Sequence, residues 1–441
     1  MPTTLTDTPS GAESLILDLH GKYLEEARPP EPFKGLNLAS VRRFETLKFP
    51  HPKHDLFSFV NAKELAWTRF QLQRDSRIGK DIVRDHVYPG CEKSVLVVAD
   101  GTFRPDLSDR SALPSQVKVS SLREAVADPA IARYLAETIE SENDVFAAIN
   151  GAFFSDGLYL EVEPAALVEA PALILYISSG SASHPTMTVP RVLAKVGRHS
   201  EVKIVVKYAG AGGNYFVNST QDFILEENSK VLYTHIQADP FESWSFAKDR
   251  VHLNRYSRFH GVNVYSGCKL ARRHHEVHLE DSGAELKLDG VSVLTGREQA
   301  HNLVRVHHEA PQCASAQHFK NIVNESSRSS FDGSVIVNKG AQLTNSDQLI
   351  NNLMLSDDAH ADSKPNLMIY ADDVKCTHGS TVGQLDEEQL FYLNSRGLSQ
   401  GMAKSLLTRS FAESILGEIQ VPAVASDLRG ILSKKLEADH A

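Results

Sequence analysis

One long segment, from about residue 146 to residue 382, limits most strongly how this chain can fold. It consists of short β-rich runs separated by Gly, Asn, Asp or Ser, and strong amphipathic helices are nearly absent from it. A β-sandwich shows this pattern, and so does a β-solenoid, in which each turn adds short strands that stack on those of its neighbours. No exact repeat of fixed length is present, so the pattern leaves both folds open.

The most closely spaced runs occupy residues 277–279, 286–288 and 291–294. Turn signals lie between them at residues 281–283 and 289–290. Such short spacing favours the coiling turns of a solenoid or a tight meander.

The regions on both sides of this segment are mainly helical in pattern. Residues 14–27 and 121–141 have helical apolar spacing, and Pro129 indicates two short helices within the second range. Residues 94–99 form a strand-like run between them. After Gly383, Asp386 and Ser399 are suited to cap two successive helices, and a third is predicted over residues 426–437. The predicted domains are residues 1–145, mainly helical, residues 146–383, mainly β, and residues 384–441, helical.

Charge and hydropathy exclude several classes of protein. The 46 basic and 56 acidic residues give 46 − 56 = −10, which disfavours binding to nucleic acid or to an anionic membrane. No apolar stretch is long enough to span a membrane, and residues 1–10 lack the basic and apolar regions of a secretory signal. A cytoplasmic location is therefore expected. The four cysteines are far apart, which excludes a disulfide scaffold and a self-contained tetrathiolate metal site.

Common catalytic signatures are absent. The chain has no P-loop, and no GxSxG, HExxH or GxGxxG motif occurs in a usable context. The two histidine doublets, 274–275 and 307–308, are expected to be structural or solvated, because neighbouring residues of a strand point to opposite faces and cannot easily chelate one ion.

Residues 370–383 are the main exception. In an extended conformation Cys376 and His378 share one face, and a thiolate beside an imidazole is a ligand pair suited to iron, zinc or copper(I). Two ligands cannot close a tetrahedral site, so further ligands would come from another segment, a substrate or a second subunit. The alternative is that Cys376 is a small buried residue and His378 a hydrogen-bonded surface group.

A different interpretation takes Asp372, Asp373 and Lys375 as the acidic cluster of a polysaccharide-cleaving β-helix enzyme. Adjacent strand residues face opposite ways, so the two acids cannot easily act as one acid–base pair. Such enzymes also usually act outside the cell. This interpretation is disfavoured.

The stretch 369–398, IYADDVKCTHGSTVGQLDEEQLFYLNSRGL, is similar to the C-terminal signature of the SufD members of the SufB/SufD family, subunits of the SUF iron–sulfur cluster assembly machinery. Residues 308–320 resemble the family's H-x-x-P-x-C-x-S-x-Q-x-x-K element, and the likeness covers most of residues 145–420. SufB-type chains carry His-Glu where this chain has His378-Gly379, which favours the SufD assignment.

The resemblance implies a mainly β fold with a right-handed parallel β-helix core, flanked by N-terminal and C-terminal α-helical regions. It implies a non-catalytic scaffold subunit that pairs with the paralogue SufB and docks the ATPase SufC through its C-terminal helices. His378, with Cys376 beside it, is then associated with a nascent, transient iron–sulfur cluster at the SufB interface. No cofactor is expected in the isolated chain, for which a homodimer is possible.

Two alternatives remain open within this interpretation. In the first, the chain is only a structural partner of SufB, with every cluster ligand on SufB. The apolar stripe of the C-terminal helices is either the docking face for the ATPase or a packing face between helices; it comprises Met402, Leu406, Phe411 and Ile415.

Overall fold

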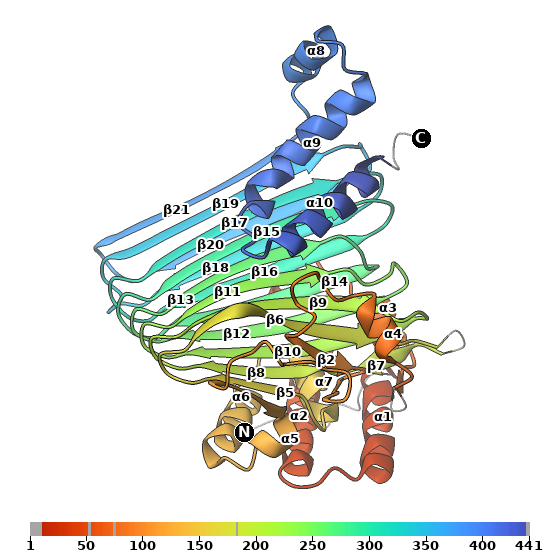
Figure 1. The fold of residues 1–441 in the computed structure, drawn as a ribbon, viewed down its shortest axis with the longest axis vertical. Helices are drawn as coiled ribbons and strands as arrows, with labels where there is room; N and C mark the ends of the chain where they lie inside the picture. The colour runs from red at the N-terminus through yellow and green to blue at the C-terminus, as the bar shows by residue number, and fades with distance from the viewer. Residues whose placement is uncertain (1–10, 52–53, 74–75, 182–183, 438–441) are drawn as a thin grey trace, which may run out of the picture.

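The computed structural model describes residues 11–51, 54–73, 76–181 and 184–437. Residues 1–10, in which no secretory signal is predicted, lie outside the described residues. The described chain is a β-solenoid with helices packed at its N-terminal end, and its C-terminal helices lie partly along its side and partly beyond its C-terminal end (Figure 1). The mainly β fold with a solenoid core and helical flanks is thus confirmed, and the sandwich is excluded.

The strands form two sheets, here called sheet A and sheet B, and from Arg191 onward successive strands alternate between them. Sheet A contains β4 (Val117–Ser121), β5 (Leu158–Val162), β8 (Arg191–Val196), β10 (Tyr215–Leu225), β12 (Trp244–Leu253), β14 (Leu270–Leu279), β16 (Gln299–His308), β18 (Arg328–Val337) and β20 (His360–Ile369), with β1 (Gln71–Leu72) and β7 (Thr186–Thr188) at its side. Sheet B contains β3 (Thr102–Phe103), β2 (Val95–Ala99), β6 (Leu167–Ser178), β9 (Glu201–Gly210), β11 (Lys230–Gln237), β13 (Arg258–Tyr265), β15 (Glu285–Leu294), β17 (Ala314–Val323), β19 (Thr344–Met354) and β21 (Val374–Gly383).

Parallel pairing stacks equivalent side chains into columns inside the solenoid. Val251, Val277, Val306 and Val335 are register partners on four successive strands of sheet A, and all four are buried. β-Branched side chains suit such a column because they are stiff and pack well on a pleated surface. The core of the fold is therefore the interior of the solenoid.

The turn predicted at residues 289–290 is wrong, because Asp289 and Gly290 lie in the middle of β15. Asp289 is buried, and Nε2 of His260 lies 3.1 Å from its carboxylate. A residue typical of turns therefore has a partner for its buried carboxylate within the sheet. A Cβ added to Gly290 would lie 2.3 Å from the ring of Phe319, its register partner on β17. Glycine is therefore needed here for close packing and not for a turn.

The helices largely follow the predicted caps. Two helices lie on either side of the break predicted at Pro129, and Asp386 and Ser399 cap two C-terminal helices as predicted. The last helix begins at Pro422, earlier than predicted, because proline is tolerated in the first helical turn. The helices are α1 (Gly11–Ala27), α2 (Phe33–Leu47), α3 (Lys63–Trp67), α4 (Lys80–Arg84), α5 (Leu122–Ala125), α6 (Pro129–Glu140), α7 (Val145–Phe153), α8 (Glu387–Ser395), α9 (Gln400–Leu416) and α10 (Pro422–Glu437), with a 3-10 turn at Asp55–Phe57. None of the described helices is long and apolar enough to span a membrane.

A buried ionic network fastens the N-terminal helices to the outer face of sheet A. Glu142, between α6 and α7, forms ion pairs with Lys248 and Arg250 on β12, with a distance of 2.7 Å to Lys248 Nζ. Two residues later Asp144 caps α7 and lies 2.7 Å from Arg272 on β14. Buried charges must be paired, so this network specifies how the helices sit on the solenoid.

The two ends of the solenoid differ. At the N-terminal end the edge strands are short and antiparallel to their neighbours, with five residues in β4 and two in β3. At the C-terminal end the edge strands β20 and β21 have ten residues each. The C-terminal end is therefore open, and it holds the predicted site.

Candidate functional site

The open end presents two long strand edges. Strands β20 and β21 each have a neighbour on one side only in the described sheets, so half of their backbone hydrogen-bonding groups face outward. Several apolar side chains near this end are exposed: Leu343, Leu349, Met368, Ile369, Tyr370 and Val382. Exposed strand edges with apolar side chains are typical of surfaces that pair with another chain.

Cys376 and His378 both lie on β21, in the last turn of the solenoid. Their register partners on β19 are Ser346 and Gln348, which are buried inside the solenoid, so both side chains belong to the inward face. No further turn covers this face within the described residues: His378 is exposed, and Cys376 is partly buried against the core. The predicted common face is confirmed, and both residues can be reached from outside the chain.

The Cys376 thiol is held in its protonated form by its surroundings. Partial burial raises its pKa, and a hydrogen bond with the backbone of Ser346 opposes this shift. A metal ion or cluster bound here would have to displace the thiol proton.

The ligand set of this pair is incomplete in the single chain. Among the described residues, three ligating side chains come together in two places, and neither includes Cys376 or His378. Asp372 and Asp373 are exposed in the turn before β21. The pair alone cannot close a tetrahedral site.

The predicted apolar stripe of α9 is divided by the structure. Met402 is 61% exposed and Leu406 is also exposed, whereas Ile415 is 4% exposed and packs with residues of sheet B. Phe411 is partly buried, and the Lys320 ammonium lies 4.7 Å from the centre of its ring. Phe411 and Ile415 thus hold α9 on the solenoid, and only Met402 and Leu406 are accessible.

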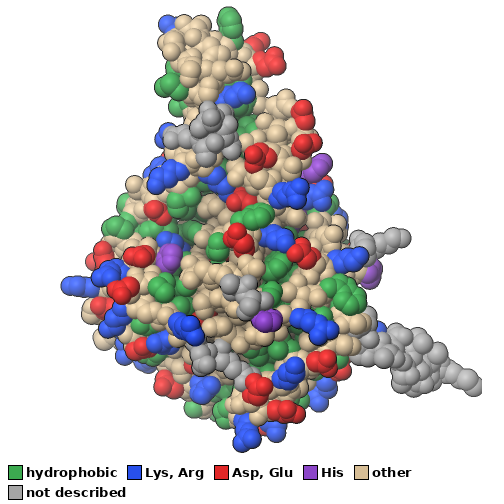
Figure 2. Space-filling view, turned by 90° about the vertical axis from the view of Figure 1, so that its right-hand side faces the viewer, with side chains coloured by type: hydrophobic (Ala, Val, Ile, Leu, Met, Phe, Trp, Pro, Cys, Tyr) green, Lys and Arg blue, Asp and Glu red, His purple; other side chains and the backbone are tan. Residues whose placement is uncertain are grey.

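Helix α8 adds two exposed aromatic residues that sequence reasoning did not single out, Phe391 and Tyr392. They are consecutive on a helix that projects beyond the solenoid, and Figure 2 shows hydrophobic side chains among charged ones on this projecting part. Exposed aromatic residues on a projecting helix are the signal that would have identified this surface.

The histidine doublets behave as predicted, with neighbours on opposite faces. His275 lies inside the solenoid 3.0 Å from Asp249, while His274 faces outward and lies 2.9 Å from Asp144. His308 is buried inside, whereas His307 is half-buried on the outer face. Neither doublet can chelate one ion by itself.

Two family models together match most of the chain. The model described as "SUF system FeS cluster assembly, SufBD core domain" matches residues 176–411, and the "SufBD protein N-terminal region" matches residues 28–174. The core match includes the open end and α8.

Similar proteins come from several bacteria. A SufBD family protein of Synechocystis, slr0076, is 30% identical over 401 residues, which is 88% of each chain. The protein SufD of Escherichia coli is 25% identical and covers 73% of this chain and 74% of its own length. The SufD protein of Bacillus subtilis is 23% identical, and the match covers 94% of this chain and 96% of that protein. The chain therefore belongs to the SufBD family of the SUF iron–sulfur cluster assembly system.

Proposed function

We propose that this chain is a SufD-type scaffold subunit that pairs with a SufB paralogue through its open end. One observation carries the proposal: Cys376 and His378 lie in the uncovered last turn, on one of its two long edge strands, each of which lacks a neighbour on one side within the described chain. A second β-helix at this end would satisfy the free backbone groups. It would also supply the ligands that the pair lacks, so a nascent cluster would be transient cargo at the interface.

The ATPase SufC is proposed to dock on the accessible part of the C-terminal helices. Phe391, Tyr392, Met402 and Leu406 are exposed there, and large apolar or aromatic side chains are the usual anchors of protein interfaces. The chain itself would act without catalysis and without a resident cofactor. We expect this complex in the cytoplasm, and homodimers of the isolated chain are a further possibility at the same edges.

The role of the ligand pair is tested by H378A alone and together with C376S in the complex with SufB and SufC. We expect unchanged folding and a large loss of cluster formation, measured by absorbance during reconstitution. K375A is the matched control, because Lys375 is exposed on the same strand and points to the opposite face. Unchanged cluster spectra in the double variant would favour the alternative, a purely structural partner of SufB.

The pairing surface is tested by introducing charge at the open end. Tyr370 and Val382 are exposed near the two edges, and Y370K with V382K should abolish copurification with SufB. L167K is the control, because Leu167 is at least as exposed as these two residues but lies on β6, far from this end. Retained pairing in the double variant would contradict the proposed interface.

The docking surface for SufC is tested by comparing M402D with F411A. M402D should weaken binding of SufC without changing the melting temperature of the isolated chain. F411A should lower that melting temperature, because it removes the ring of Phe411, which packs against the solenoid and lies 4.7 Å from the Lys320 ammonium. If M402D leaves SufC binding unchanged, the ATPase docks elsewhere.

A further inference from the structure

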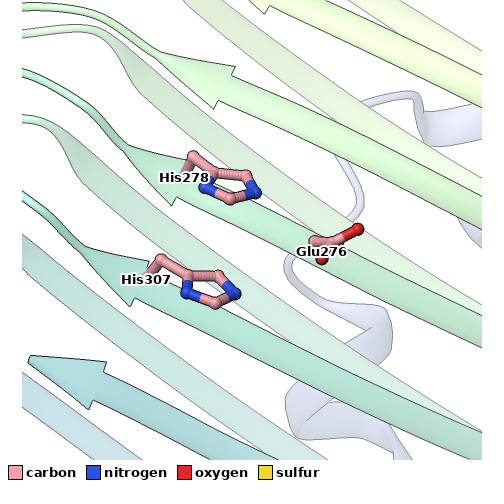
Figure 3. Close-up of side chains that lie close together, drawn as sticks. All are labelled: Glu276, His278 and His307. Atoms are coloured by element: carbon pink, nitrogen blue, oxygen red, sulfur yellow. The ribbon is translucent and has the colours of Figure 1, made fainter. Parts of the chain in front are cut away.

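Three histidines from successive turns lie one above another on the outer face of sheet A. His252, His278 and His307 are register partners on β12, β14 and β16, and their rings are stacked with centroids 5.3 and 4.6 Å apart. The alignment follows from parallel pairing, which sets neighbouring strands about 4.8 Å apart. Figure 3 shows the rings of His278 and His307 one above the other, with Glu276 beside them.

Glu276 adds a carboxylate to the last two histidines. It lies two residues before His278 on β14 and therefore on the same face. One ligand atom each of Glu276, His278 and His307 lies within 4.8 Å of the other two. Ligand atoms around a tetrahedral ion with bonds of about 2.1 Å are roughly 3.4 Å apart, so modest side-chain rotations bring these atoms to a common ion.

The imidazole of His278 is oriented as a metal ligand requires. Its Nδ1 lies 2.8 Å from Oε1 of Glu309 and donates to that carboxylate, so Nε2 is the ring nitrogen that is left to bind an ion. Burial alone would lower the pKa of His278, but the hydrogen bond to Glu309 raises it, so an ion would bind by displacing the Nε2 proton. A carboxylate in this position fixes the tautomer and the ring orientation of many histidine ligands. The side chain of His278 is 25% exposed, which leaves access for an ion and its water molecules.

The protonation states of Glu276 and His307 suit metal ligands. Burial alone would raise the pKa of Glu276, but the charge of Lys248 lowers that pKa well below its ordinary value, so the side chain is a carboxylate. Lys248 does not neutralise it alone, because its Nζ is shared, at 2.7 Å each, with Glu276 and Glu142. Burial, followed by the charge of His278, lowers the pKa of His307, which favours the neutral, ligating form of its ring.

A second group of ligating side chains, His260, Asp289 and Glu418, is a weaker candidate. The ammonium of Lys287 lies 3.3 Å from Asp289 and 2.6 Å from Glu418. The Lys287 ammonium thus engages both carboxylates of this group, which has one histidine, whereas Lys248 engages only the one carboxylate of the first group, which has two histidines.

We propose that Glu276, His278 and His307 form a binding site for a divalent first-row transition metal ion, such as Zn²⁺, Fe²⁺ or Co²⁺. Two imidazole nitrogens and one carboxylate oxygen suit these ions, whereas Mg²⁺ and Ca²⁺ prefer oxygen ligands alone. Three protein ligands leave a position for water, so the bound ion is exchangeable. The site is independent of the function proposed above, because it lies on other turns than Cys376 and His378 and on the outer face.

The test is a titration of the full chain with Co²⁺, followed by its visible d–d absorption, in a C376S background that removes the accessible thiol. We expect H307Q to weaken binding at this site at least about tenfold, and E309Q to weaken it by about tenfold through the loss of ring orientation. H252Q is the matched control, because His252 belongs to the same stack but lies outside the ligand group; it should bind Co²⁺ as the parent does.

The site is overturned if H307Q titrates like the parent, or if H252Q loses as much affinity as H307Q. E276Q is expected to match H307Q; because it also removes a partner of buried Lys248, its fold is checked by circular dichroism, and H278Q replaces it if the spectrum changes. A crystal soaked in Zn²⁺ gives an independent result. An anomalous peak between His278 and His307 supports the site, and peaks found only elsewhere reject it.

Discussion

Thr377 on the terminal strand β21 donates a hydrogen bond from Oγ1 to Oδ1 of Asp347 on β19, at 2.5 Å. The other oxygen of Asp347 lies 3.1 Å from Nε2 of His318, and Nδ1 of the same ring lies 3.5 Å from Asp289. Alternating acids and a histidine therefore connect the outer side of the last turn to turns deeper in sheet B. The strength of this connection depends on the charge of His318.

The stabilisation from His318 is expected to depend on pH. Hydrogen bonding to Asp289, together with Asp347, raises the pKa of His318 above its ordinary value despite partial burial. Its contribution is therefore fully present below the unfolded pKa of about 6.5 and is lost as pH rises through the higher folded pKa. H318Q should lower the melting temperature more at about pH 5.5 than at about pH 8.5. H360Q, at an exposed histidine of β20, should show no such difference. An equal loss at both pH values for H318Q would contradict this account.

Alkylation should identify Cys376 as the first of the four cysteines to react. Cys91, Cys268 and Cys313 are buried, and only Cys376 is partly exposed. Because burial raises its pKa, its reaction with iodoacetamide should be slow at neutral pH and accelerate as the solution becomes more alkaline. Peptide mapping after brief labelling measures this, and C376S should remove the fast phase. Earlier labelling of a buried cysteine would show that the chain opens locally.

The substitution E142Q should destabilise the attachment of the N-terminal helices. It removes one carboxylate from two buried cations, Lys248 and Arg250, each of which keeps another acidic partner. We expect a loss of about 3 kcal/mol in the free energy of unfolding, measured by urea denaturation. E140Q, at an exposed position of α6, should change it by less than about 0.5 kcal/mol. Similar midpoints for E142Q and E140Q would show that the network contributes no net stability.

The substitution G290A should destabilise the solenoid from inside. The added Cβ would meet the ring of Phe319, which cannot move freely because it packs on Phe331 with ring centres 4.7 Å apart. Overpacking of this kind costs about 1–3 kcal/mol. G340A is the control, since no heavy atom lies within 4 Å of a Cβ added there. Equal thermal stability of both variants would mean that the rings of Phe319 and Phe331 rearrange around the added methyl group without loss of stability.

Much of the architecture was predictable because it depends on local chemistry. Caps such as Asp386 and Ser399, and the break at Pro129, act within one helical turn and can be found in the sequence alone. Likewise, period-two alternation predicted that Cys376 and His378 share a face. The position of that face at an uncovered end depends on the number of turns, which the alternation within one strand does not specify.

The stack of His252, His278 and His307 was not predictable in this way. Its register partners are 278 − 252 = 26 and 307 − 278 = 29 residues apart, because the corner segments between strands differ in length. Because the number of residues per turn is not constant, the alignment of these histidines cannot be predicted from their spacing in the sequence. The turn wrongly predicted at Asp289-Gly290 has a related reason. His260, which pairs with Asp289, and Phe319, which packs against Gly290, lie on neighbouring turns.

The unequal ends of the solenoid determine what kinds of assembly it can form. Ten-residue edges at one end, against edges of five and two residues at the other, give the molecule a single surface for end-to-end growth. Two such chains that meet through their long edges leave only their short, antiparallel edges outward. A solenoid built in this way can close into a pair, and its described residues offer no second long edge from which a filament would grow.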